Sequence, residues 1–200
     1  TCGITPYDAT HLGHAATFIS YDLLQRHLID KGHTIKCVRN VTDVDDPLFA
    51  KARELGAHYP DLAAGEEARF EADMEALNAL PVASRPRASS AIPDIRGFIG
   101  MVIDSGFAYE AGGSVFFDVS RFERFGTVSH YPRERMLELA RQRGGDVDNP
   151  LKRDPLDFVM WQPSAPDEPS WDTLWGPGRP GWHIECSALA LRELGSTIHL

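Results

Sequence analysis

The spacing of apolar residues predicts a helix over residues 10–31 and a strand over residues 33–41. In the first segment, apolar side chains recur at steps of three and four, at Ala15, Phe18, Ile19, Leu23, Leu24 and Leu28. This is the period of a helix that buries one face, and Gly32 follows as a stop. The second segment alternates and is rich in β-branched residues, which favours a strand.

The rest of the chain carries similar signals. Helices are predicted over residues 47–55, 62–77, 92–105 and 182–194. Two short apolar runs on either side of Gly112-Gly113 indicate a β-hairpin within residues 107–119. A further strand is expected over residues 156–161, followed by a proline-rich loop that extends to Pro180.

These elements predict an α/β fold. Loop, helix and strand at the start make half of a Rossmann-type unit, and we expect the strand that opens this unit to be cut off at Thr1. We assign residues 1–81 to the N-terminal half of a nucleotide-binding domain and residues 82–150 to an inserted α+β connective region. Residues 151–200 then return to the nucleotide-binding domain.

Length and composition are those of an ordinary globular protein. The 200 residues are 42% hydrophobic and 24% charged, which suffices for a sizeable core. No apolar run reaches membrane-spanning length and the N-terminus lacks the layout of a signal peptide, so we expect a cytoplasmic protein. The net charge of −9 argues against a broad nucleic-acid surface and favours a small-molecule substrate.

Two histidines stand where a phosphate group would bind. His11 and His14 lie with Gly13 in the loop that opens the first predicted helix. A helix N-terminus offers unpaired N–H groups, imidazoles can donate hydrogen bonds to phosphoryl oxygens, and glycine lets an adenine ring or the backbone approach. Such pairs also occur as structural helix caps. These residues alone leave both interpretations open.

The three cysteines, Cys2, Cys37 and Cys186, are an odd number in a chain without a secretory signal. This favours thiols or a metal over a disulfide framework. Cys37 lies on a predicted strand, so we expect it to belong to the core.

Four segments together resemble a known family. They are CGITPYD at residues 2–8 followed by HLGH at 11–14, NVTDVDD at 40–46, DPLDFVMW at 154–161 and GRPGWHIECSA at 178–188. The segments are similar, in this order and spacing, to the family that comprises class I cysteinyl-tRNA synthetases and the related cysteine:glucosaminyl-inositol ligases. The resemblance covers nearly the whole chain and implies a Rossmann-like class I synthetase catalytic domain.

The resemblance implies a role for each matching residue. His11 and His14 would act on ATP as catalytic residues. Cys2, Gly3, Ile4 and Thr5 would line the aminoacyl-adenylate, with Thr17, Asn40, Val41 and Thr42 completing the wall and Trp182 covering the bound cysteine. Plain core is the alternative for Trp182. Asp43, Asp45 and Asp46 could position the substrate amine or cap the helix that follows; for Asp45 and Asp46 we favour capping.

A catalytic zinc ion is also implied, with Cys2 and Cys186 as two of its ligands. Zinc with three protein ligands keeps one position open, here for the thiol of substrate cysteine, and would discriminate against serine by coordination chemistry. Two buried structural cysteines are the alternative. The third ligand is expected to be a histidine beyond Leu200; for His183, a supporting role is preferred to ligation.

The first half-reaction is common to the whole family. The carboxylate of L-cysteine attacks the α-phosphate of ATP, with Mg²⁺ expected to assist, and gives cysteinyl-adenylate and pyrophosphate. The acceptor is then the amine of glucosaminyl-inositol, in mycothiol biosynthesis, or tRNA. Ile4, Pro6, Ala9-Thr10 and Ala16-Thr17 depart from the usual synthetase residues and favour the ligase.

Cysteinyl-tRNA synthetase is the alternative assignment, and a non-catalytic nucleotide-binding relative is a third. We expect a monomer without a membrane or nucleic-acid partner. The second ATP-binding loop and the third zinc ligand are expected outside these 200 residues, so we do not expect this segment alone to be active.

Overall fold

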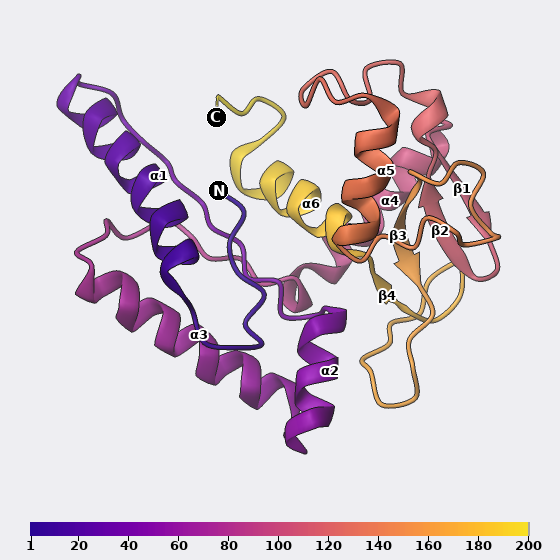
Figure 1. The fold of residues 1–200 in the computed structure, drawn as a ribbon, viewed down its shortest axis with the longest axis horizontal. Coiled ribbons are helices and arrows are strands. Elements are labelled where there is room, and N and C mark those ends of the chain that lie inside the picture. Colours follow the sequence, from indigo (N-terminus) through magenta and orange to yellow (C-terminus); the bar gives the residue numbers. More distant parts are fainter. Residues whose placement is uncertain (200) are drawn as a thin grey trace. The chain divides into compact units, whose positions relative to one another are not determined.

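The computed structural model describes residues 1–199, which divide into two compact units (Figure 1). The first unit comprises residues 1–91 together with the chain from Leu189 onward. The second comprises residues 92–188. Both helices and strands are present, and the mixed α/β fold class predicted from the sequence is confirmed. The predicted boundaries near residues 81 and 150 stay a prediction.

Three helices of the first unit lie where the apolar spacing predicts them. They are α1 (Leu12–Asp30), α2 (Asp46–Leu55) and α3 (Tyr59–Ala76). A proline in the first turn starts both α2 and α3, as expected for a residue with a fixed backbone angle and no N–H to satisfy. Gly56, with a φ of 61°, ends α2 in the left-handed conformation that glycine adopts without strain.

Three extended segments of the first unit run parallel to one another. Val41 forms isolated parallel bridges with Ile4 and with Arg87, and Val38 forms one with Ser84. The middle segment therefore lies between the other two, which is the order expected of consecutive strands in half of a Rossmann-type sheet. The full strand predicted over residues 33–41 is wrong. Pro86 has no N–H to donate, and so it interrupts the pairing between the Val38–Ser84 bridge and the Val41–Arg87 bridge.

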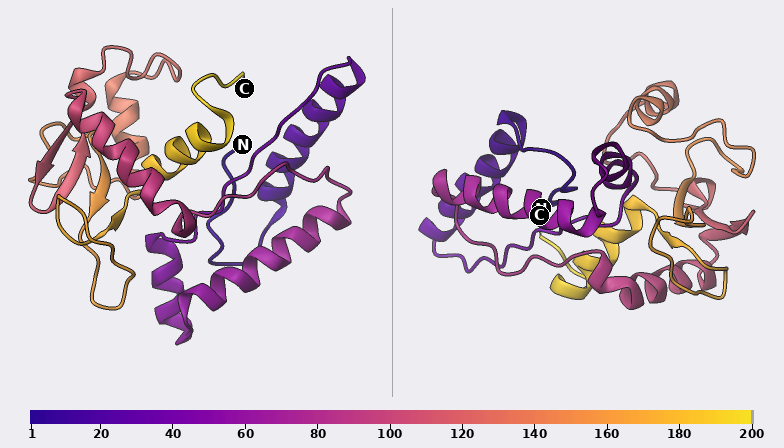
Figure 2. Two further views of the ribbon diagram at one scale, coloured as in Figure 1. Left: turned by 180° about the vertical axis from the view of Figure 1, so that it is seen from behind. Right: turned by 90° about the horizontal axis from the view of Figure 1, so that it is seen from below.

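A small apolar core joins the first extended segment to α1 and α3. It consists of Ile4, Phe18, Phe70 and Met74, with Ala79 packed against it. The rings of Phe18 and Phe70 meet edge to face with centroids 5.0 Å apart. The buried guanidinium of Arg39 lies 4.6 Å from the ring centroid of Phe18 and 5.2 Å from that of Phe70. The start of α1 and the body of α3 accordingly lie close together (Figure 2).

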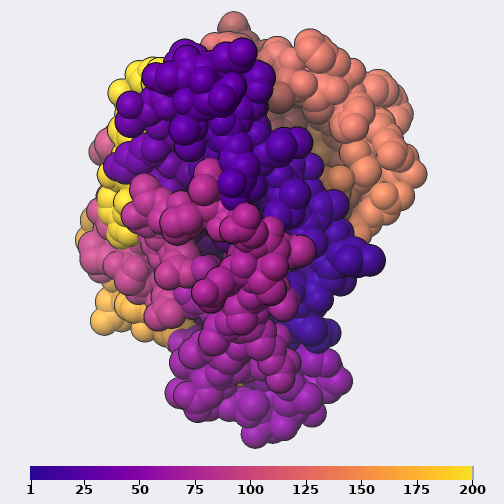
Figure 3. All heavy atoms as spheres, turned by 90° about the vertical axis from the view of Figure 1, so that its left-hand side faces the viewer, coloured from indigo at the N-terminus to yellow at the C-terminus, as the bar shows by residue number. Residues whose placement is uncertain are grey.

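The buried face of α1 differs from the predicted one. Leu23 and Leu24 are 67% and 36% exposed, although their spacing suggested core positions, and atoms of α1 lie at the surface in Figure 3. Asp22 is buried instead. Its carboxylate accepts hydrogen bonds from Arg26 Nε at 2.7 Å and from the backbone N–H of Leu80 at 2.7 Å. A polar residue that finds such partners can occupy a core position that apolar periodicity does not reveal.

The second unit contains a four-stranded antiparallel sheet in the order β1-β2-β3-β4. The strands are β1 (Ala108–Ala111), β2 (Ser114–Phe117), β3 (Phe158–Gln162) and β4 (Arg179–Pro180). The predicted hairpin is therefore confirmed, and the strand expected over residues 156–161 pairs with it. Helix α4 (Ile92–Asp104) precedes the sheet.

The remaining helices are α5, α6 and two short 3-10 turns. Helix α5 (Arg133–Gln142) was not predicted, and none of its residues is buried. Helix α6 (Trp182–Leu194) has the predicted bounds. The turns are η1 (Ser89–Ala91) and η2 (Val119–Arg121). Within the described part of the chain, no helix combines the length and the apolar character needed to cross a membrane.

Candidate active site

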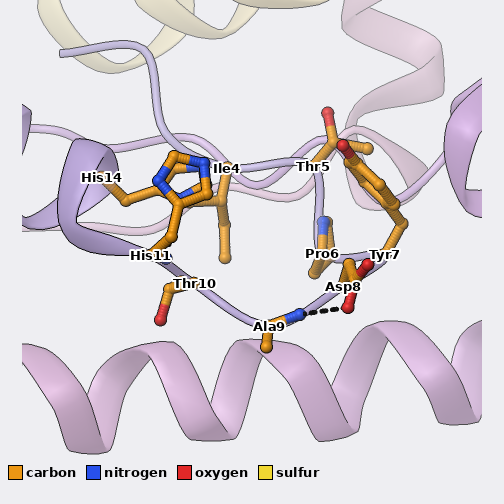
Figure 4. Close-up of a pocket in the computed structure, with 9 residues that line it drawn as sticks. All are labelled: Ile4, Thr5, Pro6, Tyr7, Asp8, Ala9, Thr10, His11 and His14. Carbon is orange, nitrogen blue, oxygen red and sulfur yellow. Dashed lines mark hydrogen bonds between the residues drawn. The ribbon is translucent and has the colours of Figure 1, made fainter.

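The first unit contains a pocket of ≈ 110 Å³ where the chain arches from the first extended segment into α1 (Figure 4). Its lining residues run consecutively along the chain and are completed by His14 in the first turn of α1: Ile4, Thr5, Pro6, Tyr7, Asp8, Ala9, Thr10, His11 and His14. Four of the predicted site residues thus come together here, namely Ile4, Thr5, His11 and His14. Hydroxyl, carboxylate and imidazole groups make part of this wall capable of hydrogen bonding, beside the apolar Ile4, Pro6 and Ala9.

The segment before the pocket is fixed by the predicted Asn40-Val41-Thr42 wall. The backbone N–H of Gly3 donates to Asn40 Oδ1 at 2.9 Å, and Asn40 Nδ2 donates to Thr42 Oγ1 at 3.2 Å. The backbone N–H of Thr42 donates to the carbonyl of Ile4 at 2.9 Å. A Cβ at Gly3 would lie 1.7 Å from the carbonyl oxygen of Asn40, so only glycine fits between these two backbones.

His11 and His14 form a reciprocal cap at the start of α1. His11 is the N-cap residue, and its Nδ1 accepts a hydrogen bond from the backbone N–H of Gly13 at 3.0 Å. Nδ1 of His14 accepts one from the backbone N–H of His11 at 3.3 Å. The ring centroids are 4.2 Å apart. This is the geometry of a capping box, with imidazoles in place of the usual hydroxyl and carboxylate.

The cap defines which ring nitrogen of each histidine carries the proton. Because both Nδ1 atoms act as acceptors, each neutral imidazole must bear its proton on Nε2. Burial, followed by the neighbouring His11, lowers the pKa of His14. A lowered pKa keeps His14 neutral and so preserves the acceptor at Nδ1. Capping is therefore compatible with phosphate binding, since it leaves one N–H donor on each ring for a ligand, and the binding role stays a prediction.

The structure gives a further reason why residue 13 is a glycine, beyond the approach of a ligand expected from the sequence. A Cβ at this position would lie 2.7 Å from Cε1 and 2.9 Å from Nδ1 of His11. The absent side chain thus makes room for the capping ring itself. Thr17, one turn further on, donates its hydroxyl proton to the carbonyl of Gly13 at 3.0 Å and is absent from the pocket lining.

The three aspartates after the middle extended segment have different roles. Asp45 is the N-cap of α2, where Oδ1 accepts from the backbone N–H of Asp46 at 2.9 Å. Its Oδ2 accepts from the hydroxyl of Thr5 at 3.3 Å, which connects the cap to the pocket wall. Asp46 lies in the first turn of α2. Asp43 accepts from the backbone N–H and the hydroxyl of Ser89, at 2.9 and 2.5 Å.

The other predicted site residues are distributed over both units. Cys2 is exposed in the first unit, whereas Cys186 is half-buried and Trp182 is 49% exposed in the second. Two buried structural cysteines, and a core role for Trp182, are therefore not supported. The ring of His183 packs against the ring of Phe158, with the ring centroids 5.1 Å apart. Burial lowers the pKa of His183. Among residues 1–199, no three His, Cys, Asp or Glu side chains form a group that could hold a metal ion.

Four polar residues at or near the pocket were missed as site residues. Tyr7, Asp8 and Thr10 line it; the first two lie in the motif at residues 2–8, and Thr10 directly precedes the motif at 11–14. Asp73 on α3 accepts a hydrogen bond from the hydroxyl of Thr10 at 2.5 Å. It lies 63 residues away in the sequence, on a helix whose pattern gives no signal of a site.

Comparisons with known proteins agree with the motif resemblance. Residues 1–200 match the family model described as the catalytic domain of class I (C) tRNA synthetases. Several similar proteins bear the name L-cysteine:1D-myo-inositol 2-amino-2-deoxy-alpha-D-glucopyranoside ligase.

Three of these relatives illustrate the match. That of Frankia alni is 49% identical over 199 residues, which cover 100% of this chain and 48% of the relative. That of Salinispora tropica is 51% identical over 201 residues, 98% of this chain and 50% of the relative. That of Mycobacterium marinum is 48% identical over 198 residues, 98% of this chain and 48% of the relative. The chain spans about half the length of these curated relatives.

Proposed function

Because this chain belongs to the family of class I (C) tRNA synthetase catalytic domains, we propose that it is part of an ATP-dependent enzyme that activates L-cysteine. The activated form is cysteinyl-adenylate. The enzyme then transfers the cysteinyl group to the amine of glucosaminyl-inositol, with release of AMP, as one step of mycothiol biosynthesis. The name that the similar proteins carry supports this choice of acceptor.

The observation that carries the proposal is the reciprocal cap of His11 and His14 in the pocket wall. Both Nδ1 atoms accept backbone hydrogen bonds, so both Nε2 atoms bear protons. Two preoriented N–H donors beside a helix N-terminus suit an anionic phosphoryl group. Charge grows on the α-phosphate of ATP when the carboxylate of cysteine attacks it. Donors aimed at this charge would lower the barrier.

The other residues of the first unit bind and orient the substrates. Ile4, Thr5 and the Gly3 backbone would lie along the adenylate, held in register by Asn40 and Thr42. The reaction at phosphorus requires little covalent participation by the protein. Alignment of the carboxylate with the phosphate, and stabilisation of the developing charge, supply most of the acceleration.

Cys2 and Cys186 are proposed as zinc ligands. Two thiolates are a donor set that zinc prefers, and a third ligand would come from elsewhere in the protein. Zinc would bind the thiol of substrate cysteine as a thiolate and so favour cysteine over serine. Trp182 would cover the bound amino acid from the start of α6. Mg²⁺ is expected to accompany ATP.

Cysteinyl-tRNA synthetase is the second candidate, since the matching family model describes tRNA synthetases. It shares the adenylate step and differs in the acceptor, a ribose hydroxyl of tRNA. The ligase is favoured by the acidic net charge of −9, because a protein that reads tRNA must neutralise many phosphates. It is also favoured by Ile4, Pro6 and Thr10, which depart from the synthetase pattern.

The decisive experiment measures AMP release by the full-length protein with cysteine and ATP, supplied with either glucosaminyl-inositol or tRNA. Acceleration by the amino sugar, with an amide-linked product, is the expected result. Stable cysteinyl-tRNA formed without the sugar would transfer the assignment to the synthetase. Absence of cysteine-dependent ATP–pyrophosphate exchange would refute both enzymatic assignments.

A further inference from the structure

Between Pro6 and His11, the chain that forms the pocket wall has one long-range polar anchor among the described residues. From Pro6 to His11, the hydrogen bonds made within the described residues are local, such as Ala9 N–H to Asp8 Oδ1 at 2.8 Å. The exception is the bond from the Thr10 hydroxyl to Asp73 Oδ2 at 2.5 Å. In Figure 4 the side chain of Thr10 points away from the two imidazoles and toward the helix that runs below the arch.

The partner of this bond is held firmly. Asp73 lies on α3 between Phe70 and Met74, two buried core residues with exposed fractions of 1% and 5%. These residues pack against Ile4, the first residue of the pocket lining, and against Phe18, one helical turn after His14. Asp73 therefore presents its carboxylate from a helix that the core already fixes against α1.

The bonded threonine is adjacent to the cap. Thr10 immediately precedes His11, whose backbone N–H bonds His14 and whose ring bonds Gly13. Tying the Thr10 side chain to α3 limits rotation of the backbone at the Thr10-His11 junction. That junction decides where the ring of His11, and with it the ring of His14, lies relative to the pocket.

We propose that Asp73 is a positioning residue for the His11–His14 pair and acts through Thr10. The proposal rests on the proposed function, in which the histidines stabilise the charge at phosphate. Asp73 itself does not touch the substrate. Loss of the Thr10–Asp73 hydrogen bond, called the tie below, should leave the histidines present but displaced. Displacement of a catalytic group by about 1 Å can cost roughly a hundredfold in rate.

The test uses four single variants of the full-length protein, one double variant and one control. Thr10→Val keeps the shape of the side chain but removes the donor, and Asp73→Ala removes the acceptor. Thr10→Ser keeps the donor and Asp73→Asn keeps an acceptor. The control is Glu75→Ala, which removes another exposed carboxylate of α3. Cysteine-dependent ATP–pyrophosphate exchange gives kcat and KM, and thermal unfolding gives Tm.

We expect kcat to fall roughly ten- to a hundredfold in Thr10→Val and Asp73→Ala, with KM for cysteine and Tm nearly unchanged. Thr10→Ser and Asp73→Asn should recover most of the loss, and Glu75→Ala should match the wild type. The double variant Thr10→Val/Asp73→Ala should be no slower than either single variant, because both remove the same bond. Additive losses, or full kcat in both single variants, would overturn the proposal.

A second measurement separates this proposal from the proposed function. Nitrogen chemical shifts of the imidazoles report which ring nitrogen bears the proton. If the tie positions the rings, Thr10→Val and Asp73→Ala should populate the other tautomer, whereas Glu75→Ala should not. Unchanged imidazole spectra in both tie variants would contradict the positioning role. If the wild-type protein shows no exchange activity while Thr10→Val and Asp73→Ala show the expected spectral changes, only the proposed function is contradicted.

Discussion

Replacing Gly13 by alanine should separate activity from stability. The added Cβ would lie 2.7 Å from Cε1 of His11, so the ring must withdraw by about 0.7 Å or more to reach ordinary van der Waals contact. This withdrawal takes Nδ1 of His11 away from the backbone N–H that it caps at 3.0 Å. The Nε2–H group of the same ring would move with it.

The two effects on stability have opposite signs. Loss of an N-cap hydrogen bond typically costs about 1 kcal/mol. Replacement of a helical glycine by alanine gains up to about 1 kcal/mol, because the unfolded chain loses less freedom on folding. The free energy of unfolding should therefore change by about 1 kcal/mol or less, and Tm by no more than about 4 °C.

The effect on catalysis has no such compensation. A displaced ring no longer meets the developing charge at phosphate, and we expect exchange to fall roughly ten- to a hundredfold. The assay is cysteine-dependent ATP–pyrophosphate exchange by the full-length protein, combined with urea unfolding. Gly65→Ala on α3 is the matched control, since a Cβ there meets nothing within 4 Å. It should gain stability and keep the wild-type rate. Wild-type exchange by Gly13→Ala would refute the link between the cap and catalysis.

Three further predictions follow from the structure. The pKa of His14 is lowered in the folded state, so its contribution to stability is complete above the unfolded pKa of 6.5 and is lost as pH falls through the folded pKa. The free energy of unfolding, measured at several pH values, should therefore fall less on acidification in His14→Leu than in the wild type. Tyr109 donates to buried Asp157 at 2.7 Å, and burial with this carboxylate raises the pKa of Tyr109 to about 12. Tyr109→Phe should cost about 1–3 kcal/mol in urea unfolding and remove a phenol whose pKa is about 12 from the titration followed at 295 nm, whereas Tyr131→Phe, 49% exposed, should change stability by no more than about 0.5 kcal/mol. Metal analysis of the full-length protein should show zinc loss in Cys2→Ala and Cys186→Ala but not in Cys37→Ala, and full zinc retention in both of the first two would contradict the proposed ligands.

The sequence predicted elements well where side-chain burial is periodic. Helix α6 has the predicted bounds, and the hairpin follows from the two short apolar runs on either side of Gly112-Gly113. Helix α5 was not predicted, although its apolar side chains, Met136, Leu137, Leu139 and Ala140, recur at helical steps and are half-buried; the helix is only ten residues long and half of its residues are charged, which weakens the apolar signal. The segment over residues 33–41 has strand-like residues, but continuous pairing also needs an N–H donor on each paired residue of the neighbouring segment, and Pro86 has none.

For the candidate site, the motif residues could be named but their contacts could not. The sequence placed His11 and His14 at a helix start, where capping and phosphate binding looked like alternatives. Only the geometry of the two Nδ1 atoms makes them compatible. Asp73 could not be found, because nothing in the local pattern of α3 connects it with a residue 63 positions earlier. Contacts between distant segments depend on packing, which local periodicity does not encode.

The contact between Gly3 and Asn40 also has an evolutionary consequence. The two backbones approach so closely that a side chain at Gly3 cannot be accommodated, whatever reaction the protein performs. A gene copy released from selection for catalysis would be free to lose the imidazoles, at the cost of a helix cap, but would still need this glycine to fold. Substitution at His11 or His14 with Gly3 retained would therefore mark a descendant that has changed its role. Substitution at Gly3 would mark one that is decaying.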